Sequence, residues 1–160
     1  MNLAAANAAG AAAFADIAEH SAWVAQHAFR DAPFDSREAM IASFIMAVHH
    51  ADPDDQLALL RAHPDLATRA KLTADSTKEQ KGAGLDTLTP AEFAHFTAMN
   101  TAYKAKHGFP FIFAVKGATK HQILAGFEAR LANDGSVEFA TAIAQVCHII
   151  RFRIEDRVQE

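Results

Sequence analysis

A histidine followed by a proline, His63-Pro64, is the pair in this chain best suited to acid–base chemistry. An imidazole exchanges its proton near neutral pH and is the most frequent general acid or base in proteins. Proline disfavours a helical conformation in the residue before it, so we expect a helix to end at His63. Pro64 itself suits the first position of a following helix. The pair predicts a stiff corner with its imidazole facing a cleft, although a histidine bonded to a backbone carbonyl fits the same residues.

Two charged residues elsewhere have positions that fit a binding site. Arg153 ends an apolar stripe at helical spacing, formed by Phe139, Ile143, Val146 and Ile150. This pattern turns Arg153 toward the core, where it can bind an anion, but a side chain that extends to solvent remains an alternative. Glu79 follows Ser76 by three residues, which is the spacing of a helix capping box, so a purely structural role for Glu79 also stays open.

One segment, residues 108–117, lacks helical character. It is aromatic and β-branched, it is bounded by Gly108 and Gly117, and it contains Pro110. Because no partner strand is evident, we expect residues 109–115 to be extended and buried rather than part of a sheet. The backbone N–H and C=O groups of such a segment need partners, and a bound ligand is one candidate. Simple core packing is the other interpretation.

The elements that must position these residues are helices. The 160 residues are 51% hydrophobic and 21% charged, which is typical of one globular domain. Much of the apolar fraction is alanine, and the chain has only seven glycines and five prolines. We therefore expect an all-α domain over residues 1–160, with about seven to nine helices and a frayed segment at residues 1–10. Helix starts are expected at the capping pairs Asp35–Glu38, Ser76–Glu79 and Thr89–Glu92, and at Thr119.

Several function classes are disfavoured by composition. The net charge of -4 is mild and the basic residues are scattered, so we expect no nucleic-acid partner. Cys147 is the single cysteine, and the His49-His50 pair with Asp52 lacks the spacing of a metal site, so we expect no metal. The N-terminus has neither a basic region nor a long apolar run, which predicts a cytoplasmic protein without a membrane span.

Five motifs follow one another along the chain. They are Phe14 with Glu19-His20-Ser21-Ala22-Trp23-Val24; Leu60-Arg61-Ala62-His63-Pro64-Asp65-Leu66-Ala67; Ser76 through Leu85; Asn100-Thr101-Ala102-Tyr103-Lys104 with Gly108-Phe109-Pro110-Phe111-Ile112; and Ile149 through Ile154. Together they resemble the 2-oxo-4-hydroxy-4-carboxy-5-ureidoimidazoline (OHCU) decarboxylase family of urate degradation. Ala22 departs from the family pattern, which has proline there.

This resemblance implies an all-helical homodimer that uses no cofactor or metal. Its small-molecule substrate would be OHCU, which is decarboxylated to S-allantoin. The resemblance gives His63 the role of catalytic acid or base and places Glu79 beside it in the catalytic site. The residues implied to bind substrate are Pro64, Ser76, Gln80, Arg153 and the segment Phe111, Ile112, Phe113, Ala114 and Val115.

Two other functions remain to be weighed against the decarboxylase. A non-catalytic helical module could keep this fold and bind a purine-derived ligand or a partner protein. A helical metal-dependent hydrolase is disfavoured because the histidines lack ligand spacing.

Overall fold

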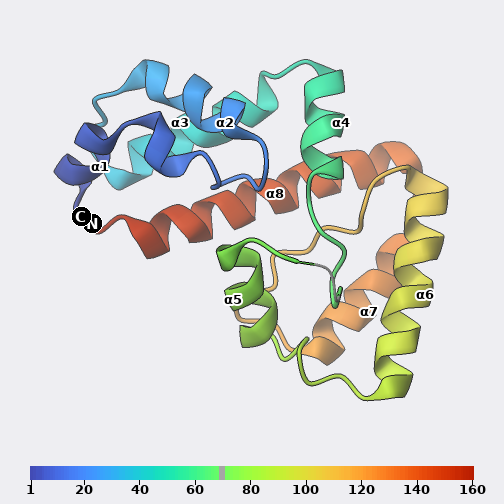
Figure 1. The fold of residues 1–160 in the computed structure, drawn as a ribbon. Helices are drawn as coiled ribbons and strands as arrows, with labels where there is room; N and C mark the ends of the chain where they lie inside the picture. The colour runs from blue at the N-terminus through green and yellow to red at the C-terminus, as the bar shows by residue number, and fades with distance from the viewer. Residues whose placement is uncertain (69–70) are drawn as a thin grey trace. The chain divides into compact units, whose positions relative to one another are not determined.

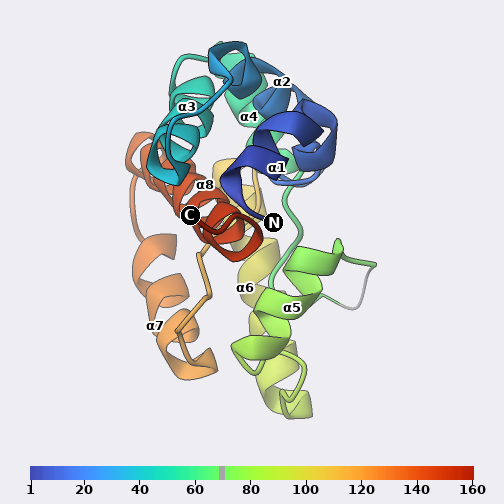
Figure 2. The same cartoon turned by 90° about the vertical axis from the view of Figure 1, so that its left-hand side faces the viewer.

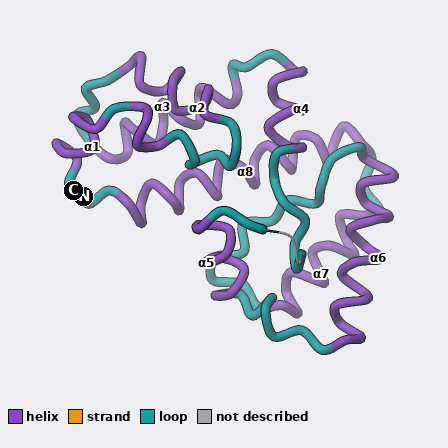
Figure 3. Tube along the Cα trace, viewed as in Figure 1, coloured by secondary structure: helices purple, strands orange, loops and turns teal. Residues whose placement is uncertain are grey.

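The computed structural model describes residues 1–68 and 71–160. Within these ranges the chain forms eight α-helices, two short 3-10 helices and no strand beyond the single bridge Asn2–Gln159 (Figures 1 and 3). The expected all-α class and helix number are confirmed. No helix in the described ranges is both long enough and apolar enough to cross a membrane.

The chain divides into two compact units, residues 1–62 with 146–160 and residues 63–145. The last helix, α8 (Gly135–Arg157), supplies residues to both units. Each unit has its own aromatic core, described below. The organisation of residues 1–160 as one domain stays a prediction.

The first unit is built mainly from short helices. Its α2 packs on α3, and the rings of Phe14, Phe29, Phe34 and Phe44 lie 5.3 to 6.2 Å apart between centroids. Tilted and edge-on ring pairs at such distances are favourable in a core. The helices are α1 (Leu3–Ala9), η1 (Ala11–Phe14), α2 (Ala22–Ala28), η2 (Phe29–Asp31), α3 (Arg37–His49) and α4 (Pro53–Arg61).

The N-terminal residues differ from the expected frayed segment, because they form α1. The Asn2 side chain caps this helix by accepting a hydrogen bond from Ala5 N–H at 2.9 Å. The Asn7 side chain exchanges two hydrogen bonds of 2.9 Å with the backbone of Phe34. The α-ammonium of Met1 donates to the Arg157 carbonyl at 2.8 Å, and the two chain ends lie together in both ribbon views (Figures 1 and 2). These long-range partners are not visible in an alanine-rich sequence.

The second unit contains α5 (Ala74–Gly82), α6 (Pro90–His107), α7 (Lys120–Leu131) and the start of α8. Here α6 packs on α7. Thr89 and Thr119 each begin a complete capping box, with Glu92 and Gln122 respectively, so both predicted starts are confirmed. Gly108 ends α6 in a left-handed conformation with φ of 77°, which glycine adopts without steric cost.

Two other predicted caps are wrong. The side chain that caps α3 is Ser36, which accepts from Ala39 N–H, rather than Asp35. The cap of α5 is Thr73, whose hydroxyl accepts from Ser76 N–H at 3.3 Å, so Ser76 lies inside the helix. In each case a neighbouring hydroxyl competes for the same role, and the spacing to an acidic residue does not decide between them.

Residues 109–115 lie outside helix and strand, as expected, and run between α6 and α7 (Figure 3). Tyr103 of α6 packs edge-on against the rings of Phe109 and Phe111, with centroids 5.9 and 5.4 Å away. Phe111 also stacks on Phe127 of α7 at 3.9 Å with an angle of 8° between the ring planes. The aromatic residues of the segment thus anchor it in the core of the second unit.

Candidate active site

The loop that follows α4 carries His63. The helix α4 ends at Arg61, so the predicted helix end near His63 is confirmed. The expected helix beginning at Pro64 is wrong, because residues 63–68 are not helical and the next helix starts at Ala74. The His63 residue is buried, with only 6% of its surface exposed.

Two buried side chains hold the backbone of this loop. Gln80 of α5 accepts a hydrogen bond from Ala67 N–H through Oε1 at 2.9 Å. Asn100 of α6 donates from Nδ2 to the Leu66 carbonyl, also at 2.9 Å. These bonds replace the helical hydrogen bonds that the sequence pattern led us to expect after Pro64. Side chains from α5 and α6 therefore fix a loop that has no regular backbone pairing of its own.

A further contact and a strained residue stiffen the same loop. Lys104 of α6 donates from Nζ to Asp65 Oδ2 at 2.7 Å. Ala67 has φ of 57°, in the left-handed region that residues other than glycine adopt infrequently. Strained backbone of this kind persists only where surrounding contacts hold it, and it tends to occur at functional sites. Asn100, Lys104 and Ala67 received no role from sequence reasoning.

The helix α5 presents Ser76, Glu79 and Gln80. Ser76 and Gln80 are buried and Glu79 is half-buried. Because residues three and four apart lie on one face of a helix, Ser76 shares a face with both Glu79 and Gln80. With Thr73 as the cap, the capping explanation for Glu79 no longer holds. The bond from Ala67 N–H occupies Gln80 Oε1 and leaves the two amide N–H donors of Gln80 available to a substrate.

The segment Phe111–Val115 belongs to the same unit as His63. Phe111, Ile112 and Val115 are buried, whereas Phe113 and Ala114 are half-buried. Its backbone is already bonded at three points, which are the carbonyls of Ile112 and Val115 and the N–H of Ala114. The expectation that a ligand satisfies the backbone groups of this segment therefore does not apply to those three groups.

Arg130 links this segment to a buried carboxylate. Glu138 of α8 accepts hydrogen bonds from Tyr103 Oη at 2.5 Å, from Asn133 at 2.9 Å, and from Nε and Nη2 of Arg130 at 3.0 and 2.9 Å. Burial and the bond to Glu138 raise the pKa of the Tyr103 hydroxyl above its ordinary value. The Tyr103 hydroxyl therefore stays protonated and donates its hydrogen to Glu138.

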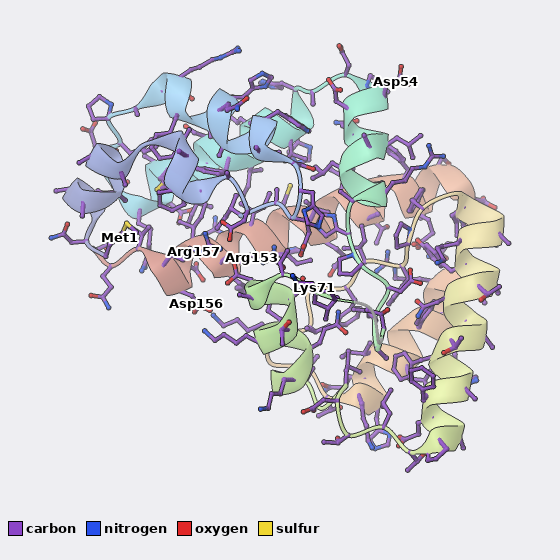
Figure 4. All side chains as sticks on the ribbon, viewed as in Figure 1. Met1, Asp54, Lys71, Arg153, Asp156 and Arg157 are labelled. Atoms are coloured by element: carbon purple, nitrogen blue, oxygen red, sulfur yellow. The ribbon has the colours of Figure 1, made fainter. Side chains whose placement is uncertain are left out.

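Arg153 lies in the first unit, on α8 (Figure 4). It donates from Nη2 to Glu19 Oε1 at 2.7 Å and from Nη1 to the Ile17 carbonyl at 3.2 Å. Both side chains of the Arg153–Glu19 pair are only 2% exposed, so the predicted inward orientation is confirmed and the solvent-extended alternative is wrong. Glu19 has φ of 54°, a second left-handed residue. Its pairing with Arg153 joins residues far apart in sequence, and no local pattern indicated it.

The structure thus places most of the predicted site residues in one unit. His63, Pro64, Ser76, Glu79, Gln80 and residues 111–115 belong to the second unit, and Arg153 belongs to the first. Asn100 is buried on α6, and its amide among the apolar residues of that helix is the signal in the sequence that points to it.

The described residues were also considered as metal ligands, and Cys147 as a nucleophile. No three histidine, cysteine, aspartate or glutamate residues in the described ranges are grouped so that they could hold a metal ion. Cys147 is buried, its Sγ lies 3.8 Å from His49 Nε2, and burial raises the pKa of its thiol to about 11. A thiol in that state is a poor nucleophile.

Comparison with known proteins points to one family. The family model described as OHCU decarboxylase matches residues 4–155. The 2-oxo-4-hydroxy-4-carboxy-5-ureidoimidazoline decarboxylase of Haloferax volcanii is 40% identical over 91% of this chain and 86% of its own length. The protein of the same name from Halalkalicoccus jeotgali is 40% identical over 90% of this chain and 82% of its own length.

A solved structure agrees with these relatives. A crystal structure of (S)-allantoin synthase superimposes with a TM-score of 0.76 and 33% identity, covering 93% of this chain. The present chain spans about half of that protein, 49% of its length. The family motifs, the fold and the sequence identity all agree, and this chain therefore belongs to the OHCU decarboxylase family.

Proposed function

We propose that this chain decarboxylates 2-oxo-4-hydroxy-4-carboxy-5-ureidoimidazoline to S-allantoin without a cofactor or metal. The observation that carries the proposal is the family match over residues 4–155. A buried histidine on a loop fixed by Gln80 and Asn100 gives that match a chemical basis. The proposal also includes the cytoplasmic location and homodimeric state that the resemblance predicts.

The reaction needs control of a proton more than it needs an electron acceptor. Loss of carbon dioxide from C4 moves the electron pair of the broken bond into the C4–C5 bond and onto the adjacent ring nitrogen. The 4-hydroxyl then loses its proton to become the C4 carbonyl, and the proton that creates the stereocentre adds to C5, which carries the ureido group. Without an enzyme, a proton can reach either face of C5. An imidazole suits both tasks, because it can exchange a proton with the substrate hydroxyl and deliver one to a single face. We assign these tasks to His63.

The α5 residues support this assignment. Glu79 can orient His63 or accept a hydrogen bond from the substrate hydroxyl. Ser76 and the N–H donors of Gln80 lie on the same helical face and can bind polar groups of the substrate. Since Gln80 also holds Ala67 N–H, one side chain would link substrate binding to the loop that carries His63.

The remaining roles concern substrate recognition. Arg153 can bind the anionic substrate through charge-assisted hydrogen bonds, which are stronger than neutral ones. Unbonded backbone groups of Phe111–Val115 can bind the ureido and ring amides, and Pro64 can contact the ring. Each of these roles comes from the family resemblance, and the buried positions of Arg153 and Phe111 are compatible with it.

A coupled assay tests the proposal. Urate oxidase and the hydrolase that follows it generate the unstable substrate in the presence of this protein, and circular dichroism follows the optical activity of the allantoin. We expect the wild type to accelerate formation of the S enantiomer. His63→Ala should lower this rate about 10²–10⁴-fold and yield racemic product, because that is the typical contribution of a general acid–base group.

His121→Ala provides the matched control, because His121 is an exposed histidine of α7 in the same unit. It should retain the wild-type rate, and both variants should keep the far-ultraviolet helical signal. S-Allantoin formed at the wild-type rate by folded His63→Ala would remove the role assigned to His63. A wild type that binds allantoin but does not accelerate the reaction would instead favour a non-catalytic binding module.

A further inference from the structure

Two neighbouring helices hold the segment Phe111–Val115 at alternate residues. Arg130 of α7 donates from Nη1 to the Ile112 carbonyl at 2.6 Å. Gln145 of α8 accepts from Ala114 N–H through Oε1 at 2.8 Å. Arg130 and Gln145 thus bind the backbone of the two residues that flank Phe113.

The side chain of Phe113 is fixed by a third contact. A Cβ atom added to Gly126 of α7 would lie 2.9 Å from Cε2 of the Phe113 ring. Real side chains do not approach so closely, and the absence of a side chain at Gly126 is what admits the ring. Three consecutive residues of the segment, 112 to 114, are therefore each held by α7 or α8.

Arg130 is itself held firmly. Its Nε and Nη2 bind Glu138, which is fully buried, and its guanidinium lies 4.4 Å from the centroid of the Phe111 ring. A bidentate contact with a carboxylate fixes both the position and the plane of a guanidinium. The hydrogen bond to the Ile112 carbonyl thus comes from a donor that has little freedom to move.

The backbone N–H and carbonyl of Phe113, by contrast, have no hydrogen-bond partner among residues 1–68 and 71–160. Phe113 is half-buried and lies in the middle of the anchored stretch. One donor and one acceptor in a single residue are complementary to an amide or ureido group, which also offers one of each.

We infer that Gly126, Arg130 and Gln145 are positioning residues that fix the backbone of residues 112–114 so that Phe113 presents its N–H and carbonyl to the ureido or ring amide of the substrate. The inference rests on the proposed decarboxylase function and adds to it the residues that set the geometry of substrate binding. These three residues touch the segment and not the reacting atoms.

Gln145→Leu tests the inference by removing the acceptor of Ala114 N–H while keeping a side chain of similar size. The loss of one positioning hydrogen bond should raise KM about tenfold. Because the acid–base group is untouched, kcat should change by less than about threefold. Gln145→Glu keeps an oxygen acceptor at the same distance and should restore KM to within about twofold of the wild type. His148→Leu is the matched control, since it replaces an exposed polar side chain of the same helix with leucine and should leave both constants unchanged.

Gly126→Ala provides an independent test that does not depend on a hydrogen bond. Alanine is a better helix former than glycine, so the helix itself is not weakened by this change. The new Cβ displaces the Phe113 ring, and we expect KM to rise about fivefold or more, since a small misplacement of a binding group can have a large effect. An increased KM with an unchanged melting temperature distinguishes positioning from general loss of structure.

The outcomes separate the inference from the proposed function. If the wild type does not accelerate S-allantoin formation, the proposed function is wrong and the inference fails with it. If the wild type is active but Gly126→Ala and folded Gln145→Leu both keep the wild-type KM, the inference alone is overturned. Should Gln145→Leu fail to fold, the KM of Gly126→Ala decides the question.

Discussion

Each unit of the molecule contains a buried arginine–glutamate pair, and the two pairs are built differently. Arg130 and Glu138 are eight residues apart, on α7 and α8, and Tyr103 and Asn133 also bind the carboxylate. Arg153 and Glu19 are 134 residues apart, and Glu19 lies outside any helix with a left-handed backbone. The first pair thus stands on regular helices, and the second depends on a strained loop residue.

This difference fits the separate roles that we propose for the two pairs. Glu138 satisfies the donors that surround it, and Arg130 uses its remaining contact on the Ile112 carbonyl, so that pair stabilises backbone. Strain at Glu19 is retained where it orients an arginine that the family resemblance assigns to substrate binding. We therefore expect substitution of Glu138 to lower stability most, with a secondary rise in KM because Arg130 positions Phe113, and substitution of Glu19 to act mainly on KM through Arg153.

The largest effect should follow Glu138→Ala. This change leaves Arg130 as a buried charge and removes the acceptor of Tyr103, and breaking such a pair typically costs about 3–5 kcal/mol of the free energy of unfolding. Urea denaturation followed by circular dichroism measures the loss. Glu128→Ala, an exposed acid on α7, is the control and should change little. A loss below about 1 kcal/mol would mean that the buried Glu138 pair stabilises the fold no more than a surface ion pair does.

Glu19→Gln should have a smaller effect on stability and a larger one on affinity. The amide keeps an acceptor for Arg153 but removes the charge, so we expect a loss of about 2 kcal/mol. An arginine that is less firmly oriented should bind the anionic substrate less well, and KM should rise about tenfold. The coupled allantoin assay measures KM. Unchanged KM with reduced stability would mean that the Glu19 pair only stabilises the fold.

The two pairs can also be separated by pH. Although burial alone would raise the pKa of the Glu138 carboxyl, hydrogen bonds from Arg130, Tyr103 and Asn133 hold it below its ordinary value of 4.5. A lowered folded-state pKa contributes stability above the unfolded value, and this contribution disappears as the pH falls through the folded-state pKa. The difference in unfolding free energy between wild type and Glu138→Gln should therefore be constant near neutrality and shrink below pH 4.5. If this difference in unfolding free energy stays constant below pH 4.5, the ionised Glu138 carboxylate does not stabilise the folded protein.

The smallest effect is expected at an exposed pair. Arg157 donates to Asp16 at 2.7 Å, but the Asp16 side chain is 60% exposed. Surface ion pairs contribute about 0–1 kcal/mol to the free energy of unfolding. Asp16→Asn should therefore lower the free energy of unfolding, measured in urea, by no more than about 1 kcal/mol and leave KM unchanged. A loss as large as that of Glu19→Gln would show that burial is not what distinguishes these pairs.

Local sequence signals predicted much of the fold. The capping boxes at Thr89 and Thr119 and the left-handed Gly108 follow from side chains within three residues of each helix end. Residues 109–115 were separated from the helices by their aromatic and β-branched composition. The errors arose where two hydroxyls compete for one cap, as with Thr73 and Ser76, and where contacts come from the far end of the chain, as with α1.

The residue types of the candidate site could be predicted from the sequence, but the hydrogen bonds that hold them could not. The inward side chain of Arg153 followed from the helical stripe, but its partner Glu19 lies in a loop 134 residues earlier. Gln80 was identified through the family motif, while its bond to Ala67 depends on how the loop after His63 is folded. Hydrogen bonds between a loop and distant helices leave no periodic trace in a sequence.

The left-handed conformation of Ala67 has a consequence for engineering. A glycine there would remove about 1 kcal/mol of backbone strain. It would also raise the conformational entropy of the unfolded chain by a similar amount, so we expect Ala67→Gly to leave the melting temperature nearly unchanged. Because the same change widens the range of conformations open to the loop that carries His63, one substitution would separate the rigidity of this loop from the stability of the fold.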